Sequence, residues 1–117
     1  MKLGIIVLSV LFFNGCLGGH NRPMQLIFEV GAKYPPAAKA NGIEGQVTLK
    51  YDISVDGVVH NVSVVQAEPK GVFEQAAKRA VEQWRYKAPI LDGVSQPVTG
   101  VVSTLKFVLA DGQYADY

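Results

Sequence analysis

Cysteine and histidine are almost absent from this chain of 117 residues. The single cysteine, Cys16, excludes an internal disulfide and any cysteine-based metal cluster. The only histidines, His20 and His60, offer little for acid–base chemistry, and the carboxylates are scattered over predicted turns, one helix face and the tail. The sequence therefore predicts a protein that is not an enzyme and needs no cofactor. A small α+β hydrolase is the alternative, but fold alone is no evidence of catalysis.

Excess charge of either sign is also missing. Eleven Lys and Arg against ten Asp and Glu give a net charge of +1, and no basic cluster exceeds Lys78-Arg79. Such a surface lacks the positive field that nucleic-acid binding requires, so we expect no nucleic-acid partner. Length and a hydrophobic content of 49% fit one small domain with a modest core.

The N-terminus carries the longest apolar run. Met1-Lys2 and the uncharged stretch 3–13 have the order of a signal-peptide start and core. This run is shorter than the ~20 residues of a membrane-spanning helix. Residues 13–16, Phe-Asn-Gly-Cys, partly resemble the bacterial lipoprotein cleavage motif, which predicts lipidation at Cys16. Phe13 and Asn14 depart from that motif, so an ordinary or uncleaved leader remains the alternative.

Residues 73–87 contain the clearest helical pattern. Apolar residues recur there at the spacing of one helical face, and charged or amide side chains fill the opposite face. Pro89 ends the pattern. A single helix of this length needs a sheet to cover.

Three strands supply that sheet. Residues 46–55 alternate strictly, with Val47, Leu49, Tyr51, Ile53 and Val55 predicted to face the core. Asp56-Gly57 is a strong hairpin signal, and residues 58–67 return as the second strand, with Val62 and Val64 on the core side. Residues 98–109 form the third, with Val101, Leu105, Phe107 and Leu109 facing the helix.

The predicted fold is α+β, a β-β-α-β order in which one main helix packs on a three-stranded antiparallel sheet. A right-handed crossover places the strands in the order 2-1-3 and leaves the third strand at an edge. A short helix over 37–40 precedes them, followed by Asn41-Gly42. We divide the chain into a leader (1–16), a linker (17–29), a folded domain (30–110) and a flexible tail (111–117).

Spaced motifs in this order closely resemble the C-terminal domain of the TonB family over about 30–109. The residues that carry the resemblance are Tyr34-Pro35, Ala38, Ile43-Glu44-Gly45, Asp56-Gly57, Asn61-Val62, Ala67, Pro69, Phe73-Glu74, Ala80 and Trp84-Arg85-Tyr86.

The resemblance implies an adaptor. TonB-like proteins transmit energy from the inner-membrane ExbB–ExbD motor to outer-membrane receptors for siderophores, haem or cobalamin, and grip a short receptor segment as an added strand. Two departures stand out: the chain has neither a leader histidine nor a Pro-rich spacer, and Gly31-Ala32 replaces a Gln-Pro pair that contributes to receptor contact in some members.

An exposed edge strand binds a partner through unpaired backbone groups, which suits the implied role. We therefore predict partner binding along the third strand, where the face away from the helix carries Val102, Thr104, Lys106 and Val108. The alternatives are a purely structural strand and a homodimer through this edge. The motif residues read as structural: these are Tyr34, Pro35, Gly45, Gly57, Phe73, Trp84, Arg85 and Tyr86.

Two functional hypotheses remain open at this point. One is a periplasmic adaptor for outer-membrane TonB-dependent receptors. The other is an envelope lipoprotein that uses the same fold to bind proteins without energy coupling. Both place the domain on the periplasmic side of the cell envelope, with membrane contact only through the leader or a lipid. A lipid on Cys16 followed by Leu17 favours the outer membrane, and an uncleaved leader favours the inner one.

Overall fold

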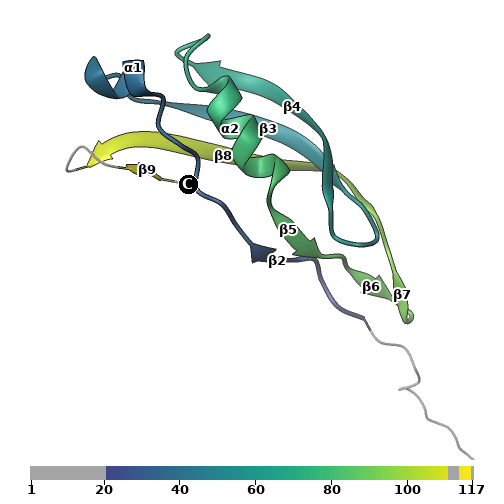
Figure 1. Cartoon of the computed structure of the whole chain (residues 1–117). Helices are drawn as coiled ribbons and strands as arrows, with labels where there is room; N and C mark the ends of the chain where they lie inside the picture. Colours follow the sequence, from purple (N-terminus) through teal and green to yellow (C-terminus); the bar gives the residue numbers. More distant parts are fainter. Residues whose placement is uncertain (1–20, 111–113, 117) are drawn as a thin grey trace, which may run out of the picture.

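The computed structural model describes residues 21–110 and 114–116, and it is an α+β domain (Figure 1). Its main sheet is antiparallel, with strands in the order β4-β3-β8-β9, and the helix α2 packs across it. Two short two-stranded sheets, β2-β5 and β6-β7, lie beside it. The elements are β2 (Gln25–Phe28), α1 (Pro36–Ala40), β3 (Gly45–Ile53), β4 (Val59–Glu68), α2 (Glu74–Glu82), β5 (Arg85–Lys87), β6 (Ile90–Leu91), β7 (Val94–Ser95), β8 (Val98–Ala110) and β9 (Tyr114–Asp116).

The core lies between α2 and one face of the main sheet. The alternation in β3 works as predicted over most of its length, because Val47, Leu49, Tyr51 and Ile53 are fully buried. Phe73, just before α2, stacks on Phe107 of β8 with ring centroids 4.3 Å apart. The core side chains of α2 are Ala77, Ala80 and Val81, whose small size lets the helix approach the sheet closely.

Two predicted core residues are exposed instead. Val55 lies beyond the end of β3, in the turn to β4, where the alternation of the strand no longer applies. Val64 pairs with Leu49 but follows a break in register between Thr48 and Leu49, and β4 is an edge strand there. Bulges bend and twist an edge strand, which turns such a side chain out of the core.

The main helix is shorter than the predicted 73–87. It ends at Glu82, and the amides of Gln83 and Trp84 bond to carbonyls three residues earlier. Residues 85–87 form β5, which pairs with β2. Leaving the helix lets the Tyr86 amide donate to the Gly57 carbonyl (2.9 Å) and places the side chain in the core.

Two segments outside the predicted folded domain (30–110) contain strands. Residues 25–28, inside the predicted linker, form β2, and Arg22 exchanges two backbone hydrogen bonds with Ile90 (2.9 and 2.8 Å). Residues 114–116, inside the predicted tail, form β9 on the edge of β8. β2 exposes all four of its side chains, and β9 pairs with the edge of β8. Apolar alternation therefore gives no clear signal for either strand.

Candidate functional site

The strand β8 has one free edge along its first part. It pairs with β3 from Val98 to Phe107, whereas β9 pairs with its other side only at Lys106 and Ala110. Within the described residues, no strand pairs with that side between 98 and 105. Unpaired N–H and C=O groups in this position can hydrogen-bond an added strand.

The four predicted contact residues lie together on the open face of the sheet. Val102, Thr104, Lys106 and Val108 are all exposed on β8, alternating with the core-facing Leu105 and Phe107. The Thr104 hydroxyl shares a 2.9 Å hydrogen bond with the Thr48 hydroxyl on β3. Lys106 and Val108 lie where β9 covers the edge, and the other two lie where the edge is free.

An Asp52-centred cluster fixes the start of β8, and the sequence reading did not identify it. One carboxylate oxygen of Asp52 accepts from the Asn61 side-chain amide (2.9 Å), and the other accepts from the Gly100 backbone N–H (3.0 Å). Both donors sit on backbone with positive φ. The hydrogen bond from Asn61 has the largest effect on the pKa of Asp52, followed by the one from Gly100, and both hold it below its usual value.

The motif aromatic Tyr34 is a buried structural residue. Its ring packs edge-on against Phe73 and Phe107, and its hydroxyl donates to the Ile43 carbonyl. Burial raises the pKa of Tyr34, and the nearby Glu44 carboxylate raises it further. Pro35 follows as the N-cap of α1, so this motif fixes the entry of the chain into the domain.

Two motif glycines permit close approach of the backbone. A Cβ at Gly45 would lie 2.1 Å from the Glu68 carbonyl oxygen. At Gly57, φ is +85° and a Cβ would lie 1.8 Å from the Tyr86 carbonyl oxygen. Both positions therefore require glycine for packing.

The Trp84-Arg85-Tyr86 motif joins the helix to the rest of the core. Trp84 is buried, and its Nε1–H donates to the Val30 carbonyl (2.9 Å). Arg85 donates to the Trp84 carbonyl (2.8 Å) near the end of α2. The Tyr86 hydroxyl bonds that of Tyr51 (2.6 Å), and burial, followed by this bond, raises the pKa of Tyr86. All three roles are structural.

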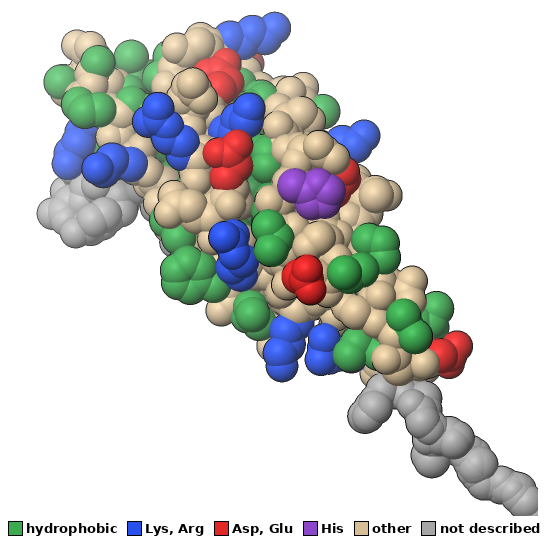
Figure 2. Space-filling view, turned by 45° about the vertical axis from the view of Figure 1, so that its right-hand side comes forward, with side chains coloured by type: hydrophobic (Ala, Val, Ile, Leu, Met, Phe, Trp, Pro, Cys, Tyr) green, Lys and Arg blue, Asp and Glu red, His purple; other side chains and the backbone are tan. Residues whose placement is uncertain are grey.

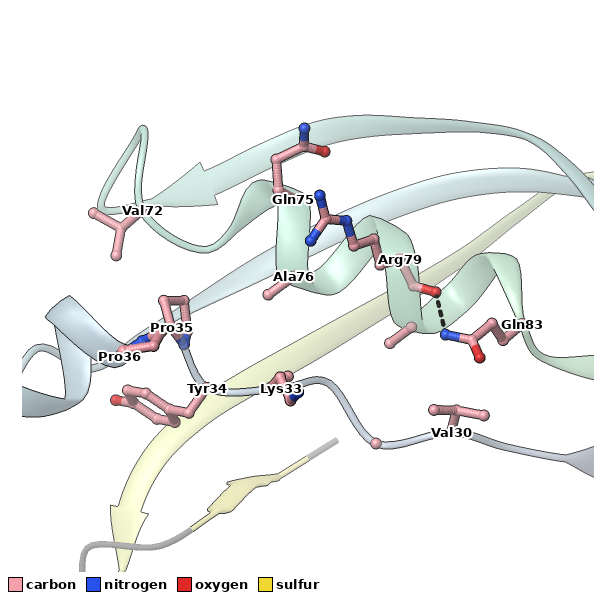
Figure 3. Close-up of a pocket in the computed structure, with 12 residues that line it drawn as sticks. Val30, Lys33, Tyr34, Pro35, Pro36, Val72, Gln75, Ala76, Arg79 and Gln83 are labelled. Atoms are coloured by element: carbon pink, nitrogen blue, oxygen red, sulfur yellow. Dashed lines mark hydrogen bonds between the residues drawn. The ribbon is translucent and has the colours of Figure 1, made fainter.

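A groove of about 530 Å³ runs between α2 and the segment 30–36 (Figure 3). Val30, Val72 and Ala76 supply apolar surface, whereas Lys33 and Arg79 stand on its two walls. No acidic residue lines it. The groove can accommodate an apolar group beside an anionic one.

Within residues 21–110 and 114–116, no group of three or more His, Cys, Asp or Glu side chains could hold a metal ion. No helix in this part of the chain is long and apolar enough to cross a membrane. The predicted lipidation residue, Cys16, and His20 lie outside the described residues. His60 is an exposed strand residue opposite Asp52.

These features define a small α+β domain with a helix-covered sheet and a partly free edge strand. The family described as Gram-negative bacterial TonB protein C-terminal matches residues 30–109. TonB of Klebsiella pneumoniae is 40% identical over 85 residues, which cover 73% of this chain and 32% of that protein. TonB of Escherichia coli K12 is 39% identical over 75 residues, covering 64% and 29%.

Solved structures show the same likeness. The TonB2 protein of Vibrio anguillarum matches with a TM-score of 0.58 and 33% identity, over 87% of this chain and 94% of that one. The solution structure of the Pseudomonas aeruginosa TonB C-terminal domain matches with a TM-score of 0.55 and 26% identity, over 72% and 82%. The chain belongs to the TonB C-terminal domain family. It spans about a third of the length of the first curated relatives it matches.

Proposed function

We propose that this protein is a TonB-type periplasmic adaptor that binds a segment of an outer-membrane receptor by strand addition. The observation that carries the proposal is the edge of β8, which lacks a partner strand in the described structure over residues 98–105. Backbone pairing supplies affinity with little demand on sequence, so one edge can serve receptors for siderophores, haem or cobalamin.

The geometry limits where the added strand begins. β9 pairs with β8 at Lys106 and Ala110, so a partner strand that extends past residue 105 would meet β9 there. The first eight residues of β8, 98–105, would span roughly 26 Å at the rise of a strand. A receptor segment of six to eight residues therefore fits the free part of the edge without displacing β9.

Amide hydrogen exchange tests this proposal directly. The probe is a set of synthetic peptides copied from the N-terminal periplasmic segments of TonB-dependent receptors in the same genome. Because successive N–H groups of a strand point to opposite sides, we expect new protection at alternate residues within 98–105. Protection on β4, the opposite edge of the sheet, or along the groove beside α2 would overturn the assignment of the site.

Two proline variants provide the matched control. Ser103→Pro and Thr104→Pro remove adjacent N–H groups, of which one faces β3 and the other faces the free edge. The edge-facing variant should stay folded and lose peptide binding. Val65→Pro on the exposed part of β4 should leave peptide affinity unchanged. If a folded edge-facing variant binds peptide as well as the parent, strand addition at β8 is wrong.

A second candidate function, a lipidated accessory domain without energy coupling, is favoured by the short reach of the N-terminal segment. Arg22 is already paired with Ile90, so only residues 17–21 separate Cys16 from the folded part. Five residues extend no more than about 18 Å. A domain tethered at Cys16 could meet an outer-membrane receptor only from the outer membrane itself.

Genetic complementation separates the two functions. If the protein is an accessory module, the native chain should fail to restore siderophore uptake in a TonB-deficient cell, even when well expressed. Restored uptake together with crosslinks to ExbD would establish the energy-coupled function instead. Labelling with a fatty-acid analogue, abolished by Cys16→Ser, would establish the lipid anchor.

A further inference from the structure

Large apolar side chains are exposed together at one end of the molecule. This end, here called the arm, consists of residues 21–28, β5 and the β6–β7 hairpin. Ile27 and Phe28 of β2 are 54% and 56% exposed, and Leu91 and Val94 of the hairpin are 57% and 59% exposed. Figure 2 shows hydrophobic side chains at the end of the molecule where the described chain begins. Exposed large apolar side chains gathered at one end of a molecule are candidates for an interaction surface.

The arm is held rigidly to the start of the described chain. Arg22 pairs with Ile90 through both backbone groups, and its side chain donates to the Ala88 carbonyl (2.9 Å). The Asn21 side chain accepts from the Asp92 amide at the hairpin turn (2.8 Å). Whatever anchors the preceding residues therefore holds the hairpin close to the same anchor.

The sequence before Asn21 identifies the surface that the arm meets. Residues 3–13 are uncharged and mostly apolar, which suits a membrane-associated leader, and only residues 14–20 separate them from Asn21. Seven residues extend no more than about 25 Å, and a lipid on Cys16 would lie closer still. With an uncleaved leader or a lipid on Cys16, the arm would stay within a short distance of the bilayer surface.

We propose that the arm docks on a lipid surface, with Ile27, Phe28, Leu91 and Val94 entering the interfacial layer. Its charged side chains are few, with Arg22, Arg85 and Lys87 against Asp92, so it carries a small net positive charge. The contact that we propose is made by the apolar side chains, so it should form on uncharged lipid and persist at high salt. This contact adds to the one made by the leader or lipid, and it is independent of what the β8 edge binds.

Docking in this way would orient the binding edge. β8 begins only three residues after β7, so the free part of its edge starts beside the arm, whereas β9 covers the far end. An arm on the bilayer would place the start of β8 nearest to the membrane surface, with the strand leading away from it. A receptor segment emerging from that same membrane would meet the free edge first.

A fluorescent probe in the full chain tests the contact. Val94→Cys and Val102→Cys, each in a Cys16→Ser background, are matched because both valines are 59% exposed, one on the arm and one on β8. Each is labelled with an environment-sensitive fluorophore and mixed with phosphatidylcholine vesicles. The probe at position 94 should shift to shorter wavelength and be quenched by nitroxide-labelled lipid, in low and high salt alike. The probe at position 102 should do neither.

Further variants distinguish the arm from the leader. Ile27→Asp with Leu91→Asp should abolish the shift at position 94, although the leader still carries the protein with floated vesicles. Val102→Asp should leave the shift unchanged. Equal emission from both probes, or a concentration-dependent shift at position 94 without vesicles, would overturn the proposal, the latter in favour of contact between two copies. Peptide binding at β8, measured on the variant with Ile27→Asp and Leu91→Asp, should persist, so the two proposals can fail separately.

Discussion

The two faces of the main sheet are made by the same strands but differ in how tightly the rest of the chain constrains them. On the face toward α2, Leu49, Tyr51 and Phe107 are fully buried, and motif residues from three other segments pack against them. On the opposite face, Val102 and Thr104 contact mainly their strand neighbours and solvent. The comparison indicates that the family motif residues build the scaffold, whereas the residues proposed to meet a partner are not held by core packing.

The largest test of this contrast is truncation of the motif tryptophan. Trp84→Ala should lower the free energy of unfolding by about 3–5 kcal/mol, because it leaves a cavity between α2 and the sheet and an unpaired Val30 carbonyl. Val102→Ala on the open face should change it by less than about 0.5 kcal/mol. Urea denaturation of the two variants measures both values. Similar losses from both would erase the distinction between the faces.

The second test separates two reasons why a position requires glycine, namely close packing at Gly45 and positive φ at Gly42. Gly45→Ala should cost about 1–3 kcal/mol, since its Cβ would meet the Glu68 carbonyl oxygen at 2.1 Å. Gly42→Ala meets nothing within 4 Å but keeps a φ of +65°, so it should cost about 1–2 kcal/mol from backbone strain alone. If Gly45→Ala is as stable as the parent, the close approach beside Phe73 is relaxed more easily than the structure indicates. Thermal and urea unfolding should agree on the ranking.

Sequence periodicity was sufficient for the parts of the fold that form one apolar face. β3 is recognisable because its buried residues recur at every second position, and α2 because its buried residues recur at every third or fourth position. β5 was missed because Tyr86 and Lys87 continue a helical composition, and only the Gly57 carbonyl and the Tyr51 hydroxyl, distant in sequence, draw them into a strand. The loose alternation over 24–30 is compatible with an extended segment, but β2 exposes its four side chains, so the pattern does not place it in the folded domain. β9 pairs at the edge of β8, and side-chain periodicity does not predict it.

The candidate site was predictable to a different extent. The open-face residues of β8 follow from alternation alone, once the strand itself is placed. The length of the free edge of β8 depends on whether the chain folds back as β9. That pairing is made by backbone groups, so the side-chain pattern does not predict it. The Asp52–Asn61–Gly100 cluster could not be foreseen either, since its members meet only after both hairpin and crossover have formed.

The third test concerns the tyrosine pair inside the core. Tyr86→Phe should cost about 1 kcal/mol at neutral pH, because the Tyr51 hydroxyl loses one partner and keeps Ser103 (2.8 Å). In the parent, the raised pKa of Tyr86 makes the unfolded state ionise first, so stability falls as the pH rises above about 10. The variant should lose less stability over that alkaline range. An identical alkaline decline in parent and variant would show that another group is responsible.

The smallest expected effect lies on the open face. Thr104→Val removes the 2.9 Å bond to Thr48 but keeps the branched shape that strands favour, so stability should change by no more than about 0.5 kcal/mol. Peptide affinity at the β8 edge should also stay within about twofold, because strand addition is carried by backbone groups that this change leaves in place. Isothermal titration with the receptor peptides measures it, with the edge-facing proline variant as the positive control for loss. A tenfold loss in Thr104→Val would mean that the partner reads side chains on the open face, and the binding surface would then extend across β3 and β8.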